Sequence, residues 1–84
     1  MGTYGENIQS AMAAQIKAEM AARDWKQPNL ADATGIPTST LHRYLSGARD
    51  IPLPVFAEIA KALDLSVMEL AGRAQRRLDG ENVQ

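Results

Sequence analysis

The sequence predicts an all-α protein built from five helices, several of them short. Apolar residues recur at helical spacing in five separate segments, and glycines stand where two of these segments end. No stretch alternates apolar and polar residues convincingly with a period of two, so we expect no sheet. The chain has 84 residues and a hydrophobic fraction of 45%, which suit one small domain with a single core. Aromatic residues make up only 5%, so that core must be aliphatic.

The first helix is expected from about residue 6 to residue 23, and its alanine content gives it a high intrinsic helix propensity. Its apolar residues recur every four positions, at Ile8, Met12, Ile16 and Met20. The two glycines within residues 1–5 predict a flexible N-terminus before it.

A short second helix is expected from Lys26 to Thr34, with Lys26 as its N-cap. Trp25 and Leu30 then have the spacing of a hydrophobic staple. Gly35 follows the last turn, where a left-handed residue is favoured. The third helix is expected over residues 38–45 and ends at a second glycine.

The fourth helix is expected over residues 53–63, where apolar residues again form one stripe. Ser66 and Glu69 match a capping box, so a fifth helix should begin near Val67. Residues 79–84 look like a polar C-terminal tail, which leaves residues 6–78 as the folded domain.

Composition excludes several classes of function. The chain has no cysteine, which rules out disulfides and thiolate metal sites and fits a cytoplasmic protein. No apolar run approaches the roughly 20 residues that span a bilayer, so no membrane partner is expected. The single histidine, His42, lacks an evident nucleophile partner, so we expect neither an enzyme nor a cofactor or metal site. The net charge is −1, so any basic surface for nucleic acid must be local.

Two segments carry a resemblance to a known family. Residues 27–47 read QPNLADATGIPTSTLHRYLSG, and residues 53–70 read LPVFAEIAKALDLSVMEL. Their order and spacing resemble the Cro/repressor-type (XRE-like) helix-turn-helix family over about residues 8–72. The resemblance implies a compact five-helix, lambda-repressor-like DNA-binding domain, with the helix-turn-helix at about residues 27–46. Leu30, Ile36, Leu41 and Tyr44 would then face inward, against the other three helices.

The resemblance also implies which residues meet double-stranded DNA. The side of the third helix that stays free would enter the major groove. The positions that would face base edges are Thr38, Ser39, His42 and Arg43. The positions that would face phosphates are Lys26, Gln27, Thr40 and Arg49.

Some of these residues have plain alternatives. Thr38 and Ser39 could instead cap the third helix, and Thr40 could pack rather than bind a phosphate. Pro37 replaces the usual polar cap, so the third helix could begin one residue late. The basic cluster of Arg73, Arg76 and Arg77 could bind a partner, or could simply complement the C-terminal end of a helix dipole.

The function implied is a DNA-binding transcriptional regulator, in the first place a phage-type or bacterial repressor. Because so small a chain offers few base contacts, a homodimer on a palindromic operator is expected. The fifth helix and the turn before it are candidates for the dimer surface, through Leu65, Val67, Met68 and Leu70. One alternative is the antitoxin of a toxin–antitoxin pair, which would also bind a toxin protein. Another is a degenerate domain that only dimerises.

Overall fold

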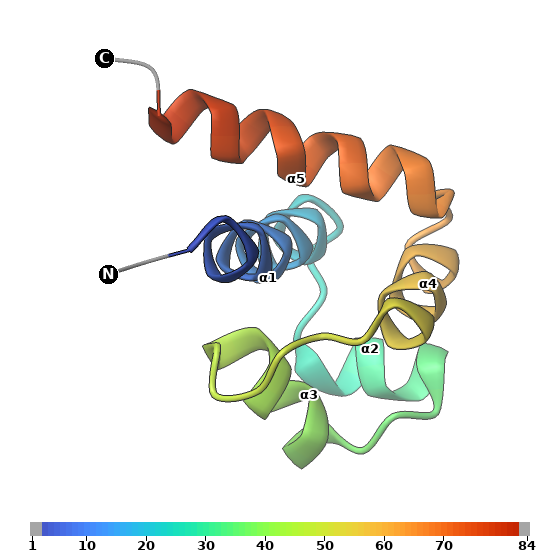
Figure 1. The fold of residues 1–84 in the computed structure, drawn as a ribbon. Coiled ribbons are helices and arrows are strands. Elements are labelled where there is room, and N and C mark those ends of the chain that lie inside the picture. Colours follow the sequence, from blue (N-terminus) through green and yellow to red (C-terminus); the bar gives the residue numbers. More distant parts are fainter. Residues whose placement is uncertain (1–2, 83–84) are drawn as a thin grey trace.

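The structure, a computed structural model, describes residues 3–82, with side chains up to residue 80. This part of the chain forms five helices and no strand, so the predicted all-α class is confirmed (Figure 1). The helices are α1 (Tyr4–Ala22), α2 (Gln27–Thr34), α3 (Thr38–Ser46), α4 (Leu53–Ala62) and α5 (Val67–Asn82).

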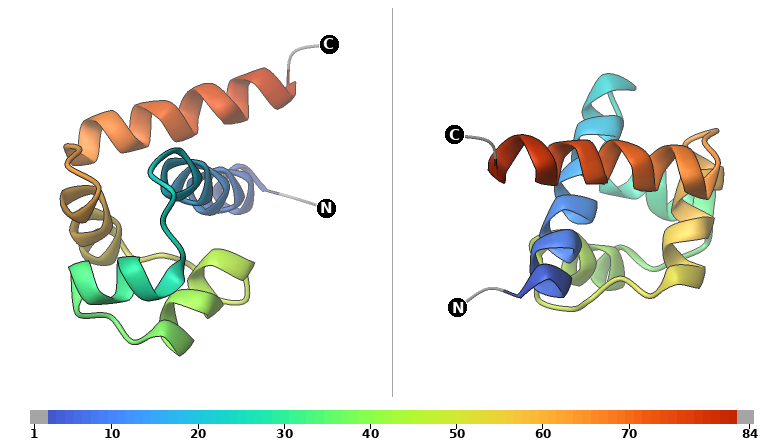
Figure 2. Two further views of the ribbon diagram at one scale, coloured as in Figure 1. Left: turned by 180° about the vertical axis from the view of Figure 1, so that it is seen from behind. Right: turned by 45° about the horizontal axis from the view of Figure 1, so that its top comes forward.

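Helix α1 separates two parts of the molecule. Helix α5 crosses one side of α1, while α2 and α3 lie together on its other side (Figures 1 and 2). Helix α4 packs against both α2 and α5 and so connects the two parts. The helix-turn-helix pair therefore packs mainly on α1 and α4, and the start of α5 reaches the same buried core through Leu70. This arrangement leaves α3 at the end of the molecule opposite α5 (Figure 1).

The main core lies between α1, α2, α3 and α4 and is closed by the start of α5. It is largely aliphatic, as the composition predicts. Its largest fully buried side chains are Phe56, Ile16, Leu30, Leu41, Ile59, Leu63 and Leu70. A second, smaller cluster joins α1 to the C-terminal half of α5 through Ala11, Ala74 and Leu78.

The N-terminal helix begins earlier than the sequence predicts. Tyr4 and Gly5 belong to α1, so these two residues are not a loose end. The reason is a capping box: the Glu6 N–H donates to the Thr3 hydroxyl at 3.1 Å, and the Thr3 N–H donates to the Glu6 carboxylate at 2.8 Å. The pattern Thr-Tyr-Gly-Glu was visible in the sequence. Of the expected flexible end, Met1 and Gly2 lie outside the described residues.

The C-terminal helix continues where a tail was expected. Asp79 and Gly80 lie within α5, which extends to Asn82. Leu78 is buried against α1, and the Gln75 amide donates to the Asp79 carboxylate at 2.9 Å one turn along the helix. These contacts keep the polar end of α5 helical. Val83 and Gln84 lie outside the described residues.

Helices α1 and α4 end in the same way, at aspartates with a left-handed backbone. Asp24 has φ = 56° and Asp64 has φ = 61°. The N–H groups of Trp25 and Leu65 then bond back to the carbonyls of Met20 and Ala60, at 2.8 and 2.9 Å. This is the Schellman arrangement, which satisfies carbonyls that have no partner within the helix. Both aspartates were missed from the sequence, because glycine is the residue expected at such positions.

Candidate nucleic-acid interface

The turn between α2 and α3 is shaped by Gly35 and its neighbours. Gly35 has φ = 77°, which an L side chain adopts only with strain. The Thr34 hydroxyl donates to the Leu30 carbonyl at 2.8 Å and accepts from the Ile36 N–H at 3.2 Å, so it fixes the end of α2. Ile36 is half-buried and packs on the core. The turn therefore sets α3 at a defined angle to α2.

The third helix begins at Thr38, with Pro37 as its N-cap. Pro37 therefore does not delay the start of the helix by one residue, which the sequence had left open. Proline has no side-chain acceptor, and no side chain caps this helix. Thr38 and Ser39 therefore stand in its first turn, and both are exposed.

Helix α3 has two clearly different sides. One side is buried in the core and consists of Leu41, Tyr44 and Leu45, which are 0%, 5% and 3% exposed. The other side is exposed and polar, and it carries the four residues predicted to face base edges. These are Thr38, Ser39, His42 and Arg43. One surface of one helix thus brings the four together.

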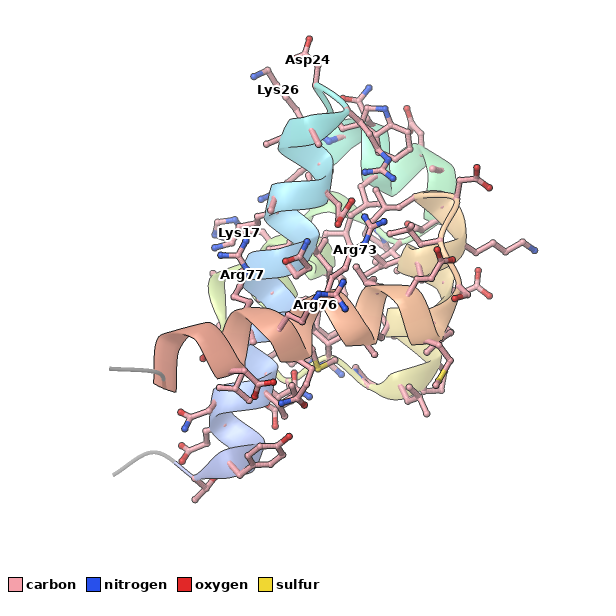
Figure 3. All side chains as sticks on the ribbon, turned by 90° about the horizontal axis from the view of Figure 1, so that it is seen from above. Lys17, Asp24, Lys26, Arg73, Arg76 and Arg77 are labelled. Carbon is pink, nitrogen blue, oxygen red and sulfur yellow. The ribbon has the colours of Figure 1, made fainter. Side chains whose placement is uncertain are left out.

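The predicted phosphate-facing residues lie at the start of α2, on α3 and in the loop after α3. Gln27 is the first residue of α2 and is half-buried, and Lys26 just before it is exposed. The Lys26 side chain makes no cap, but its N–H donates to the Asn29 amide oxygen at 2.7 Å, which holds the start of α2. Thr40 is half-buried on α3. Lys26 and Asp24 both project outward at the end of α1 (Figure 3).

Arg49 lies in the loop that follows α3 and is exposed. Its N–H donates to the Arg43 carbonyl at 3.2 Å, and its guanidinium lies 5.5 Å from the centre of the Tyr44 ring. A cation over an aromatic face at this distance is attracted by the ring quadrupole. Arg49 is therefore held beside the C-terminal end of α3.

The cations of this surface are free to meet an anion. Both ion pairs within the part of the chain that has described side chains involve Glu19. Arg43, Arg49 and Lys26 consequently have no carboxylate partner there. Guanidinium groups of this kind bind phosphate oxygens or guanine edges through paired hydrogen bonds.

The basic cluster on α5 belongs to a different part of the molecule. Arg73, Arg76 and Arg77 belong to α5, which lies at the opposite end of the molecule from α3 (Figure 1). Arg73 pairs with Glu19 at 2.8 Å, and the Arg77 side chain donates to the Gln15 amide oxygen at 3.1 Å. Two of these three arginines therefore tie α5 to α1.

Glu19 is the buried charge of this connection, with 7% of its side chain exposed. Burial raises its pKa, but hydrogen bonds from Arg73, Arg23 and Gln15 outweigh burial and bring the pKa down from 4.5 to about 2. In turn, the hydrogen bond and the negative charge of Glu19 raise the pKa of Arg73. The carboxylate stays ionised and has a structural task.

The four predicted dimer residues have different environments. Leu70 is fully buried, so it is not available to a second copy of the chain. Leu65 and Val67 are half-buried and pack against the main core. Met68 is 82% exposed. Only Met68 of this set is free for an interface.

Gln9, which was missed from the sequence, is half-buried on α1 and holds the loop that carries Arg49. The Gln9 side chain accepts from the Ile51 N–H at 2.7 Å and donates to the Ile51 carbonyl at 3.2 Å. The sequence does contain a pattern that indicates the burial of Gln9, because Gln9 lies on the same face of the helix as Ala13, Ile16 and Met20, which are all buried. A polar residue in such a line needs a hydrogen-bonding partner.

Among the described residues, no group of three or more His, Cys, Asp or Glu side chains converges as metal ligands would. None of the described helices combines the length and the apolar character that crossing a bilayer requires.

A short helix, a tight glycine turn and a second helix with a free polar side define a helix-turn-helix DNA-binding protein. Residues 15–75, most of the chain, match the family described as the Cro/C1-type HTH DNA-binding domain, and the chain belongs to this family. The resemblance stated from the sequence is thereby confirmed. No curated protein and no solved structure matched the chain.

Proposed function

We propose that the protein is a transcriptional repressor that places α3 in the major groove of a palindromic operator and acts in the cytoplasm of a bacterial or phage-infected cell. The observation that supports this is the exposed polar side of α3, opposite a side that is almost completely buried. The major groove is about 12 Å wide and admits one helix. Helix α3 lies at the end of the molecule, where a duplex can approach it (Figure 1).

Base recognition is assigned to the exposed side of α3. Arg43 has the donor pair that fits guanine O6 and N7, a contact worth about 1–3 kcal/mol of discrimination. Ser39 and Thr38, in the first turn, reach base edges through their hydroxyl groups. His42 lies next to Arg43 on the same exposed side.

Phosphate contacts are assigned to the residues around this surface. Gln27 stands at the N-terminus of α2, where free N–H groups and the helix dipole favour an anion. Arg49, after α3, supplies a cation beside it, and Lys26 supplies another before α2. Thr40 offers a hydroxyl from α3. Such contacts fix the position of the protein on the duplex without reading its sequence.

Binding as a homodimer follows from the small size of the site. One α3 helix offers few base contacts, and two copies related by a twofold axis double them. The two half-sites are then one turn of the duplex apart, about 34 Å. We assign the dimer contact to the surface around Met68, the residue of the predicted set that the fold leaves exposed.

The test is selection of bound sites from a random pool of double-stranded DNA, with the full chain as bait. The proposal predicts enrichment of a palindrome whose half-sites are about 10–10.5 base pairs apart, centre to centre. An enriched motif without symmetry would contradict the homodimer but not DNA binding. Failure to enrich any motif at low salt would contradict the function itself. If a stoichiometric second protein co-purifies from the native cell, the antitoxin alternative replaces the simple repressor.

A further inference from the structure

The loop between α3 and α4 is exposed in its middle, at residues 47–50. A pocket of about 190 Å³ lies between this loop and α1, and Gln9, Ser10, Tyr44, Arg49 and Asp50 are among the residues that line it. Arg49 and Asp50 are both exposed. Ile51, two residues after Arg49, is buried in the main core, so apolar packing anchors the loop there, and hydrogen bonds to its backbone set the path of the exposed residues before it.

At the end of the loop nearer α4, Gln9 binds both backbone polar groups of Ile51. The two hydrogen bonds measure 2.7 and 3.2 Å and join residues 42 positions apart in the sequence. Ile51 itself is only 3% exposed, so its backbone groups would otherwise lack partners. The Gln9 amide thus fixes the backbone at this end of the loop, and the buried Ile51 side chain anchors it to the core.

At the end nearer α3, Arg49 is attached to the helix directly. Its N–H donates to the Arg43 carbonyl, and its guanidinium lies over the Tyr44 ring. The backbone of Arg49 is therefore held between α3 on one side and, two residues later, Gln9 of α1 on the other. Loss of either attachment leaves a loop with a pocket beneath it and more conformations available.

We infer that Gln9 is a positioning residue for DNA binding, because it holds the loop in which Arg49 presents its guanidinium to a phosphate. This inference rests on the proposed function and deepens it. A contact that is already in place before binding costs less entropy when the complex forms. Gln9 lies on α1 and touches no DNA in this scheme, so it acts only through the loop.

The test compares two glutamines of α1 that are both half-buried and each make two side-chain hydrogen bonds. Gln9→Met removes the bonds to Ile51, whereas the control Gln15→Met removes bonds to Glu19 and Arg77. The probe is the duplex enriched from the random pool, and the variant Arg49→Ala marks the contact that Gln9 would position.

We expect Arg49→Ala to lower the affinity about tenfold and to reduce the steepness of the salt dependence by about one unit per protomer. Gln9→Met should lower the affinity at least about threefold and also flatten the salt dependence, while Gln15→Met should leave both unchanged. In the double variant, Gln9→Met should add little to Arg49→Ala, because both act on one contact. A purely structural role of Gln9 would not produce this coupling.

A second measurement follows the loop itself. Hydrogen exchange at the Ile51 amide should become faster in Gln9→Met and stay unchanged in Gln15→Met. Gln9→Glu keeps the acceptor for the Ile51 N–H, so its exchange rate and its affinity for the duplex should lie between those of wild type and Gln9→Met. It replaces Gln9→Met in the test if Gln9→Met does not fold. If wild type and Gln9→Met bind equally well while Arg49→Ala binds weakly, the inference is wrong and the proposed function stands. If wild type binds no duplex, both fall.

Discussion

Glu19 on α1 and Arg73 on α5 form an ion pair of 2.8 Å between residues 54 positions apart in the sequence. The same carboxylate accepts from Arg23 at 2.8 Å, and Arg23 in turn donates to the Leu63 carbonyl at the end of α4. One buried charge thus joins three helices. Removal of a single partner from such a group is usually costly, because the charges left behind lose their compensation.

The first prediction concerns stability at low pH. The pKa of Glu19 lies near 2 in the folded protein and near 4.5 as its ordinary value, so the unfolded chain takes up the proton first as the pH falls. The stability that Glu19 contributes is therefore complete above pH 4.5 and is lost as the pH falls towards 2. The contribution of Glu19 to the free energy of unfolding is roughly 3 kcal/mol. Denaturant unfolding of wild type from about pH 5 to about pH 2 should show this loss.

The variant Glu19→Gln isolates that contribution. Its free energy of unfolding should be lower at neutral pH and should fall less on acidification than that of wild type. Glu58→Gln, which changes an exposed carboxylate on α4, serves as the control and should retain the pH dependence of wild type. Equal pH dependence in Glu19→Gln and wild type would show that Glu19 is not the group responsible.

The second prediction concerns sequence recognition by Arg43. Arg43→Ala should lower the specific affinity by about 1–3 kcal/mol and relax the preference at one base pair of each half-site. Binding to a set of single-base operator variants measures both effects. Arg76→Ala removes the same kind of side chain from α5, which lies at the opposite end of the molecule from α3, and should change neither (Figure 1). Unchanged affinity and preference in Arg43→Ala would remove this residue from the recognition surface.

The third prediction concerns salt. If each protomer neutralises about three phosphates, the slope of log K against log salt should be about −5 for the dimer. Titrations of the operator duplex at several salt concentrations give this slope. A slope near zero would mean that the protein makes no phosphate contacts.

The fourth prediction compares the effects on stability of replacing two glycines, Gly35 and Gly72, by alanine. Gly35 has a positive φ, and a methyl group added to it would meet only open space, so Gly35→Ala should destabilise the fold by about 1–2 kcal/mol through backbone strain alone. Gly72 lies inside α5, where an added Cβ would meet only the Arg76 side chain at 3.6 Å. Gly72→Ala should therefore stabilise the protein by about 0.5–1 kcal/mol. Thermal or denaturant unfolding should show shifts of opposite sign.

Local patterns were sufficient to predict most of the fold. The spacing of apolar residues located all five helices, and the Ser66–Glu69 capping box, with bonds of 3.0 Å in both directions, correctly marked the start of α5. Both signals act within one or two turns of a helix, so they can be read without knowledge of the fold. Gly35 and Gly47 likewise mark the ends of α2 and α3, with φ of 77° and 84°.

Features that depend on distant parts of the chain were not predictable in this way. Gln9 binds Ile51, 42 positions away, and Glu19 binds Arg73, 54 positions away, and nothing local identifies those partners. Leu70 was left open between core and interface because its burial depends on how α5 meets the rest of the protein. The identity of the DNA-facing residues came from the resemblance, and their common exposure on α3 agrees with it.

The docking of α5 on α1 has a consequence for how two copies meet. Leu70, Ala74 and Leu78 are buried within the monomer. Among the described residues, the large apolar side chains that stay exposed are single ones at separate places in the chain, namely Tyr4, Leu53 and Met68. Stable preformed dimers usually bury about 800 Å² per partner. We therefore expect free protein to be mainly monomeric at low concentration, with pairing completed on the operator. Occupancy would then rise steeply over a narrow range of protein concentration, so small changes in expression would switch the promoter.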